Sequence, residues 1–223
     1  MTRVWHKKDP ALLARVKHEV ETEYPDLRVI TERDTVFLRG SFPVTDGDEI
    51  LDRFLIEVQF PDDFPDSIPI VREIGGRIPW YEDRHVNRMG AQAGEACPIV
   101  PEEWLIRPDR DSIRNFLAGP TRNFFLGQIV VEQGKPWPFG ERPHGMPGLW
   151  EFYGELVGTT DKAAIRGYLS YLSRENLKGH WECPCGSKKR LRNCHLETLK
   201  DLRQKIAPRV AKQALLRLGF QNQ

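Results

Sequence analysis

A cysteine cluster near the end of the 223-residue chain constrains its folding more than any other feature of the sequence. Three of the four cysteines and an adjacent histidine fall within thirteen residues: Cys183, Cys185, Cys194 and His195. Thiolate and imidazole ligands satisfy a tetrahedral zinc ion without water, so this grouping predicts a structural zinc site. A motif of about fifteen residues cannot bury a core, so the metal would have to supply its folding energy.

Charge is nearly balanced over the whole chain, with 33 Lys and Arg against 32 Asp and Glu. This balance gives no overall argument for a nucleic-acid or membrane partner. The cations are unevenly distributed, since Lys188, Lys189, Arg190 and Arg192 lie within the cysteine cluster and the tail after Lys200 is also basic. The start of the chain lacks the apolar core of a secretory signal, and no apolar run approaches the roughly 20 residues that span a bilayer. A cytoplasmic location is therefore expected, where thiols stay reduced.

The pattern along the first part of the chain predicts one helix followed by four strands. Asp9 and Pro10 form a favourable helix start, and apolar residues then recur at helical spacing up to Tyr24. Runs rich in β-branched and aromatic residues follow at 27–31, 35–44, 53–60 and 68–74. The links between these runs are short, which favours an antiparallel meander over parallel crossover units. The predicted fold class is therefore α+β.

A long segment without periodicity, residues 75–108, follows the strands and contains the fourth cysteine, Cys97. Loops of this length in compact domains are usually functional or disordered. Helical patterns return at 113–125, 149–177 and 196–218, with a break expected at Pro208. The Pro- and Gly-rich stretch 134–148 indicates a domain boundary. We therefore expect a first domain over 1–145, a helical connector over 146–180, and a zinc knuckle with a C-terminal helix over 181–223.

Residues within the long loop resemble the active-site segment of ubiquitin-conjugating enzymes. His85-Val86-Asn87 precedes Gly94-Glu95-Ala96-Cys97, and Trp104 and Pro108 follow. That family has a His-Pro-Asn motif, a Gly shortly before the catalytic Cys, and a Trp and a Pro after it. The resemblance spans roughly Leu12 to Val131. It implies a UBC-like domain with an N-terminal helix, a four-stranded antiparallel meander, an active-site loop and further helices.

The chain departs from the pattern of that family at several positions. Val86 replaces the proline, the spacing from Asn87 to Cys97 is longer than usual, and Pro98 stands where the eukaryotic members usually carry Leu. With its compact chain and attached cysteine cluster, the protein is more similar to bacterial ubiquitin-conjugating-like proteins. Those proteins occur in operons for antiphage defence and ubiquitin-like modification, so the resemblance implies a role in antiviral defence.

The resemblance also implies an activity, in which Cys97 holds a protein C-terminus as a thioester and transfers it to an amine. Such a thioester splits one difficult acyl transfer into two easier ones. By analogy, Asn87 would stabilise the oxyanion formed during amine attack, and His85 would shape the loop. The chain has no Gly-rich nucleotide loop, so a separate activating enzyme or an already activated donor is implied. The donor would be a ubiquitin-like protein or the C-terminus of a nucleotidyltransferase.

The cysteine cluster resembles the SEC-C motif, a zinc-binding motif best known from the C-terminus of the SecA translocation ATPase. Besides the four ligands, the matching residues are Pro184, Gly186, Ser187 and Asn193, whereas Lys188 replaces a second glycine. A closed set of four ligands leaves no open position for catalysis. Motifs of this family are generally docking modules, so we expect the knuckle to bind a protein partner rather than nucleic acid.

Two other functions remain open at the level of the sequence. The first is a non-catalytic docking module that combines a UBC-like scaffold with the zinc knuckle. The second is a cysteine hydrolase in which Cys97 works with His85 or His144, although no orienting group for a triad can be placed. A lone cysteine is often buried and inert, and Asn87 could instead satisfy its own loop backbone.

Overall fold

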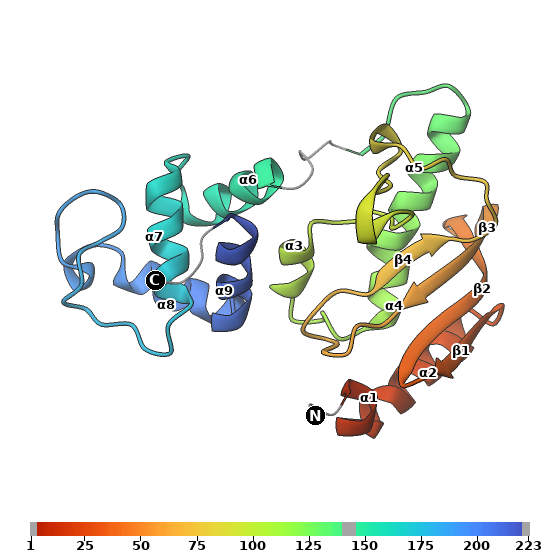
Figure 1. The fold of residues 1–223 in the computed structure, drawn as a ribbon, viewed down its shortest axis with the longest axis horizontal. Helices are drawn as coiled ribbons and strands as arrows, with labels where there is room; N and C mark the ends of the chain where they lie inside the picture. Colours follow the sequence, from red (N-terminus) through yellow and green to blue (C-terminus); the bar gives the residue numbers. More distant parts are fainter. Residues whose placement is uncertain (1–3, 140–145, 220–223) are drawn as a thin grey trace. The chain divides into compact units, whose positions relative to one another are not determined.

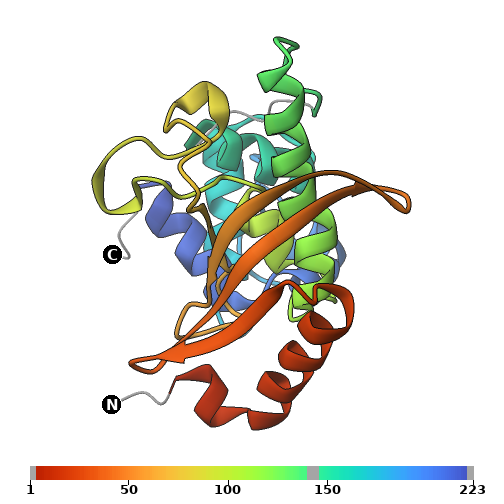
Figure 2. The same ribbon diagram turned by 90° about the vertical axis from the view of Figure 1, so that its right-hand side faces the viewer.

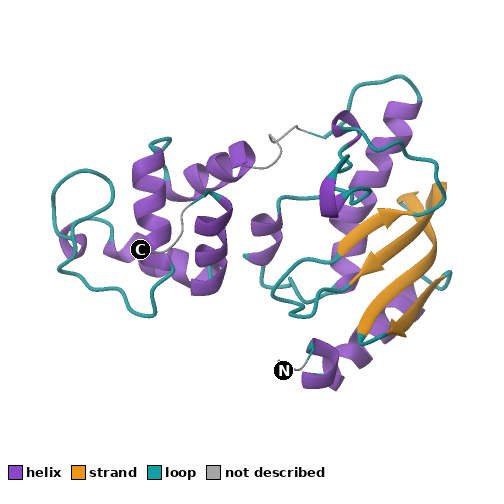
Figure 3. Cartoon of the chain, in the orientation of Figure 1, coloured by secondary structure: helices purple, strands orange, loops and turns teal. Residues whose placement is uncertain are grey.

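The computed structural model describes residues 4–139 and 146–219, and the chain divides into two compact units. The first unit comprises Met1–Pro101 and Asp109–Glu141, and the second comprises Glu102–Pro108 and Arg142–Gln223. All described strands belong to the first unit, whereas the described part of the second unit is helical with connecting loops (Figure 1, Figure 3). Residues 102–108 therefore group with the second unit, although they follow Cys97 closely in the sequence.

The first unit is built around a four-stranded antiparallel sheet in the order β1-β2-β3-β4. The strands are β1 (Leu27–Glu32), β2 (Thr35–Asp46), β3 (Glu49–Gln59) and β4 (Ile70–Glu73). This meander confirms the α+β class and the strand order predicted from the sequence. Gly47, with a φ of 56°, forms the tight link between β2 and β3, because glycine adopts this left-handed conformation without strain. Figure 2 shows how the two long strands curve across the unit.

One face of the sheet carries the apolar core of the first unit. Alternate residues of β2 and β3 are buried there, as the two-residue period of a strand requires: Leu38, Phe42, Phe54, Ile56 and Val58. Helix α1 (Trp5–Lys8) precedes α2 (Pro10–Glu23), which packs on β1, while α5 (Arg122–Glu132) packs on β2. Asp9 caps α2 as predicted, since its carboxylate accepts a hydrogen bond from the Leu12 amide at 2.9 Å.

The helical segment after the long loop is interrupted by a wider turn. Ser112 caps α4 (Ile113–Phe116), a π-helical stretch follows over Leu117–Thr121, and α5 then begins. Pro120 lies inside the π-helical stretch and has no N–H to donate. The sequence pattern predicts one continuous helix here, whereas the wider turn accommodates the proline within it.

The described part of the second unit contains five α-helices and a short 3-10 helix at Leu191–Asn193. The α-helices are α3 (Pro101–Leu105, of which the first residue belongs to the first unit), α6 (Met146–Val157), α7 (Lys162–Leu172), α8 (Leu196–Lys205) and α9 (Pro208–Arg217). The stretch 149–177, predicted as helical throughout, breaks at Gly158, and Asp161 caps the next helix by accepting from the Ala163 amide. The predicted break at Pro208 is confirmed, with the proline at the start of α9. None of the described helices has the length and apolar composition needed to cross a membrane.

Candidate functional site

The loop that carries Cys97 folds back so that its His-Val-Asn segment pairs with the residues just before the cysteine. The Cys97 amide donates to the His85 carbonyl at 2.8 Å, and the Asn87 amide donates to the Glu95 carbonyl at 2.9 Å. The Gly94 amide in turn donates to the Asn87 carbonyl at 2.8 Å. The structure thus brings together the three predicted residues His85, Asn87 and Cys97, although ten residues separate the last two in the sequence.

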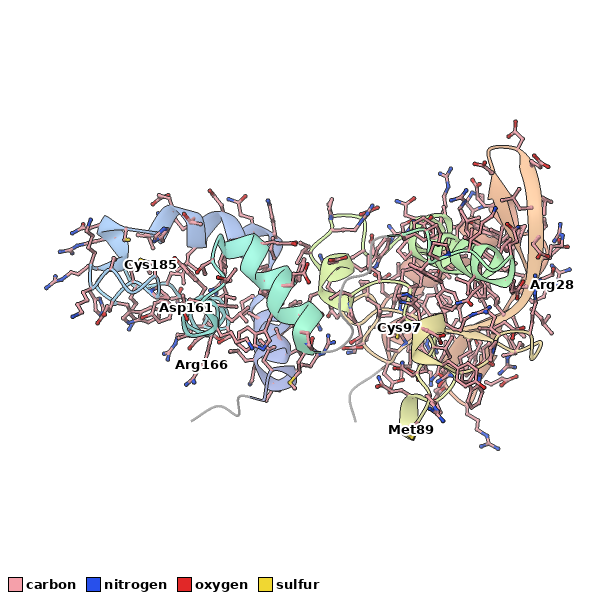
Figure 4. The ribbon with its side chains drawn as sticks, turned by 90° about the horizontal axis from the view of Figure 1, so that it is seen from above. Arg28, Met89, Cys97, Asp161, Arg166 and Cys185 are labelled. Carbon is pink, nitrogen blue, oxygen red and sulfur yellow. The ribbon has the colours of Figure 1, made fainter. Side chains whose placement is uncertain are left out.

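This paired loop is fastened to the edge strand of the sheet. The Ala96 amide donates to the Val71 carbonyl of β4 at 2.8 Å. Next to this bond, the Arg72 guanidinium donates to the Glu95 carboxylate at 2.7 Å. Figure 4 shows Cys97 and the 78% exposed Met89, which lies on the outer part of the same loop. Cys97 is therefore positioned by the sheet and not by a freely moving loop.

The Cys97 side chain is half-buried, and the Asn87 side chain lies near enough to its sulfur to affect the pKa of the thiol. Burial raises the pKa of the Cys97 thiol above its ordinary value, and the negative charge of Glu95 raises it further. The Asn87 side chain acts in the opposite direction and lowers the pKa of the thiol. Asn87 therefore lies where its side-chain amide can donate to negative charge that develops near the sulfur.

His85 occupies a strained backbone position at the base of the loop. Its φ is 53°, a left-handed conformation that costs a residue other than glycine about 1–2 kcal/mol. Its ring stacks on Trp137, with centroids 4.1 Å apart, and Trp137 in turn covers Gly127 of α5. A Cβ at Gly127 would lie 2.4 Å from the Trp137 ring, so this contact depends on the glycine. The described contacts of His85 therefore shape the loop.

Two residues that were not predicted from the sequence anchor the loop to α5. The Arg84 guanidinium donates to the Gln128 side-chain oxygen at 2.7 Å, and the Gln128 amide nitrogen donates back to the Arg84 carbonyl at 2.6 Å. Gln128 is completely buried, so these reciprocal bonds satisfy a polar group that would otherwise be costly. The sequence gives one indication of this anchor, because Gln128 is the single amide in an otherwise apolar stretch of α5.

Four candidate metal ligands converge in the second unit. All four ligand atoms of Cys183, Cys185, Cys194 and His195 lie within 4.8 Å of one another. His195 Nδ1 is 3.2 Å from both the Cys183 and the Cys194 sulfur. A tetrahedral zinc ion with Zn–S bonds near 2.3 Å would hold two sulfurs about 3.8 Å apart, and those of Cys185 and Cys194 are 3.6 Å apart. The four predicted residues can therefore hold one metal ion.

The tight turn between the candidate ligands contains Lys188, the residue that departs from the expected glycine. The Cys183 amide donates to the Lys189 carbonyl at 2.8 Å, which closes the turn around Gly186 and Lys188. Both turn residues have a positive φ, 78° for Gly186 and 56° for Lys188. A glycine would adopt the second conformation without strain, so Lys188 costs about 1–2 kcal/mol there. The turn nevertheless forms with all four ligands in place.

The turns that carry the candidate metal ligands pack against helix α7. A Cβ at Gly167 would lie 2.7 Å from Pro184 Cβ, so only a glycine permits this approach. One turn further on, the Tyr171 hydroxyl donates to the Glu182 carbonyl at 2.8 Å. The buried Tyr168 side chain lies beside the Cys183 sulfur, and its ring meets His195 edge-on. Residues that support the ligands in this way orient them for a metal, and the sequence alone did not identify them.

The ligand sulfurs differ in their surroundings. Burial is the main cause that raises the pKa of the Cys183 thiol, whereas the hydrogen bond to Ser187 lowers the pKa of Cys185. A bound cation would favour the thiolate at every cysteine of the group, because metal ligation requires deprotonated sulfur. Three sulfurs and one imidazole nitrogen form a closed donor set that fits a structural zinc ion.

Comparison with known proteins finds no relative of this chain. No protein-family model matches the sequence, and neither a curated protein nor a solved structure matches it. Any functional assignment therefore depends on the arrangement of Asn87 and Cys97 in the first unit and on the four candidate ligands in the second.

Proposed function

We propose that the first unit is an acyl carrier of the ubiquitin-conjugating type. In this proposal Cys97 holds a protein C-terminus as a thioester and transfers it to an amine. The observation that supports it most is the backbone pairing of His85 and Asn87 with the residues up to Cys97, which places the Asn87 side chain beside the half-buried Cys97 sulfur. A carrier thiol has to be reachable by another protein, and a hydrogen-bond donor has to lie close to the carbonyl oxygen of the acyl group.

The proposed reaction has two steps. In the first, Cys97 loses its thiol proton to solvent and its thiolate attacks the carbonyl carbon of an activated C-terminus, while the previous carrier leaves with the bonding electron pair and takes up a proton. In the second, an amine nitrogen attacks the thioester carbonyl, and Asn87 donates to the oxygen while it carries negative charge. The intermediate then collapses to an amide, the C–S bond breaks, and the Cys97 thiolate takes up a proton. The amine loses its extra proton to solvent.

The raised pKa of Cys97 favours a carrier over a cysteine hydrolase. Hydrolases activate their cysteine with a neighbouring imidazolium, which lowers the thiol pKa. Here burial and Glu95 raise it, and the His85 ring stacks on Trp137. A thiolate of higher pKa is also a poorer leaving group, so its thioester resists loss to water. His144, the other histidine considered for a hydrolase, lies outside the described residues.

We further propose that Cys183, Cys185, Cys194 and His195 bind zinc, which folds the knuckle and takes no part in the transfer. The donor would be a ubiquitin-like protein or a nucleotidyltransferase C-terminus, delivered by a separate activating enzyme. The cytoplasm is the proposed compartment, because free thiols and a thiolate zinc site both persist under reducing conditions. A role in bacterial antiphage defence follows from the resemblance described above.

A trapping experiment in cells tests the carrier function. The tagged wild-type protein should show an adduct with a small protein that disappears with reductant. Cys97→Ser should accumulate an adduct that resists reductant, because an oxygen ester replaces the thioester, and Cys97→Ala should show none. An equal adduct in the wild type and in Cys97→Ala would reject the carrier and leave the docking module as the remaining function.

A further inference from the structure

The two units differ in charge, although the chain as a whole is nearly neutral. The first unit contains 17 Lys and Arg against 23 Asp and Glu, a formal charge of −6. The second contains 16 against 9, a formal charge of +7. An excess of cations on one domain is the electrostatic signature of a surface that binds polyanions. The balance over the whole chain conceals this difference.

Part of the excess is concentrated on the candidate metal site. Lys188, Lys189, Arg190 and Arg192 are all exposed, and none of them has an ion-pair partner among the described residues. Many cations of the first unit are paired instead, for example Arg39 with Glu32 at 2.6 Å. Glu182 pairs with Arg190 across an isolated antiparallel bridge without an ion pair among the described residues, and this one carboxylate does not neutralise four cations.

Backbone pairing adds a fifth cation to this group. The Leu191 amide donates to the Trp181 carbonyl at 2.7 Å, and the Arg192 amide donates to the Gly179 carbonyl at 3.0 Å. These bonds place the exposed Lys178 next to the strand-like segment that carries Arg190 and Arg192. We call these five cations the basic face: Lys178, Lys188, Lys189, Arg190 and Arg192. The four metal ligands hold the turn that presents them.

The basic face lacks the apolar side chains that most protein or membrane partners require. No large hydrophobic side chain is exposed in the described segment 174–192, and those exposed in the described part of the second unit are Met146 and Leu216. Protein interfaces depend on buried apolar anchors, and membrane-surface segments insert apolar side chains. A phosphate backbone requires only closely spaced cations.

We propose that the basic face binds the sugar-phosphate backbone of nucleic acid without sequence preference. This partner differs from the protein partner expected from the SEC-C resemblance, and the inference does not depend on the chemistry of Cys97. If four cations each neutralise a phosphate, log K should fall with log salt at a slope of about −2.8 for a single strand. Affinity should then fall about 50-fold between roughly 50 and 200 mM salt.

Fluorescence anisotropy of the full, zinc-loaded chain with labelled single-stranded and duplex oligonucleotides tests this proposal. The variant Lys188→Gln, Lys189→Gln, Arg190→Gln, Arg192→Gln keeps only Lys178 of the basic face, so it should bind at least about tenfold more weakly, with a slope of about −0.7. The matched control is Lys8→Gln, Lys17→Gln, Arg28→Gln, Arg33→Gln, which removes the same charge from exposed positions of the first unit. It should keep the wild-type affinity, as should Cys97→Ala. Unchanged zinc content would show that the knuckle variant still folds.

Three outcomes would overturn the proposal. The first is equal weakening by the knuckle variant and the control, since binding would then reflect net charge and not the basic face. The second is the absence of binding to either oligonucleotide by the wild-type protein. The third is salt-sensitive binding to phosphatidylserine-containing vesicles or to an acidic protein without binding to nucleic acid, which would assign the face to another partner. None of these results bears on whether Cys97 carries an acyl group.

Discussion

The two units hold their cysteines in different ways. In the first, backbone pairing with His85 and attachment to β4 position Cys97 over a sheet whose core is already complete. In the second, the sulfurs of Cys183, Cys185 and Cys194 lie together on turns that have little core of their own. A sheet can present one thiol without using it for stability, whereas the proposed zinc site would make the knuckle depend on its thiols for folding. In our proposal, cysteine is therefore an acyl carrier in the first unit and a ligand of structural zinc in the second.

Removal of the metal should produce the largest difference between the units. Zinc contributes roughly 10–16 kcal/mol of apparent binding free energy in small structural sites, so chelation should unfold the knuckle. Hydrogen exchange should then accelerate at the Cys183 and Leu191 amides, which close the turns. The Ala96 amide of the first unit is the internal control and should keep its protection. Equal protection of the knuckle with and without chelator would contradict a structural metal.

Replacement of Asn87 should have the next largest effect, this time confined to the first unit. Asn87→Ala keeps both backbone bonds of the residue but removes the donor to the acyl oxygen, so amine transfer should slow by about 10²–10³. Formation of the thioester should change much less. Single-turnover discharge of a loaded carrier measures this. Asn115→Ala, which removes an exposed hydrogen bond to Asp109, is the control and should transfer at the wild-type rate. Unimpaired transfer by Asn87→Ala would exclude the oxyanion role.

A smaller effect on zinc affinity should follow from adding a methyl group where α7 packs against the knuckle. Gly167→Ala places a methyl group 2.7 Å from Pro184 Cβ, and such overpacking costs about 1–3 kcal/mol. Zinc affinity, measured by competition with a chromogenic chelator, should fall accordingly. Gly119→Ala makes the same chemical change where no atom lies within 4 Å, and it should leave zinc affinity unchanged. An unaltered zinc affinity in Gly167→Ala would mean that packing against α7 does not support the knuckle.

The smallest expected effect is a shift in the titration of Cys97. Glu95→Gln removes a negative charge that disfavours the thiolate, so the pKa of Cys97 should fall. The pH profile of alkylation by iodoacetamide should move to lower pH. The folded-state pKa is raised, so this thiol stabilises the fold below the ordinary thiol pKa, and that stability is lost as pH rises through the raised value. Glu49→Gln, at the exposed β2–β3 hairpin, should leave the profile unchanged, and an unshifted profile in Glu95→Gln would contradict the assigned cause.

Local patterns in the sequence predicted the strands, the cap at Asp9 and the break at Pro208, because each depends on neighbouring residues. These local patterns also predicted which side chains converge at the candidate metal site, since its four possible ligands are close in the chain. Contacts between distant segments were not predictable. The bonds between Arg84 and Gln128 and the packing of Gly167 on Pro184 depend on how whole elements pack, which no local pattern specifies.

Mass spectrometry of the trapped protein tests the central claim, that the first unit carries an acyl group on Cys97, most directly. Cys97→Ser would be purified from cells under denaturing conditions, digested, and searched for branched peptides. If Cys97 is an acyl carrier, one branched peptide is expected, in which the C-terminal residue of a second protein is esterified at position 97. A peptide at position 97 that carries no acyl group, or a modification on Cys185 or Cys194 instead, would contradict it.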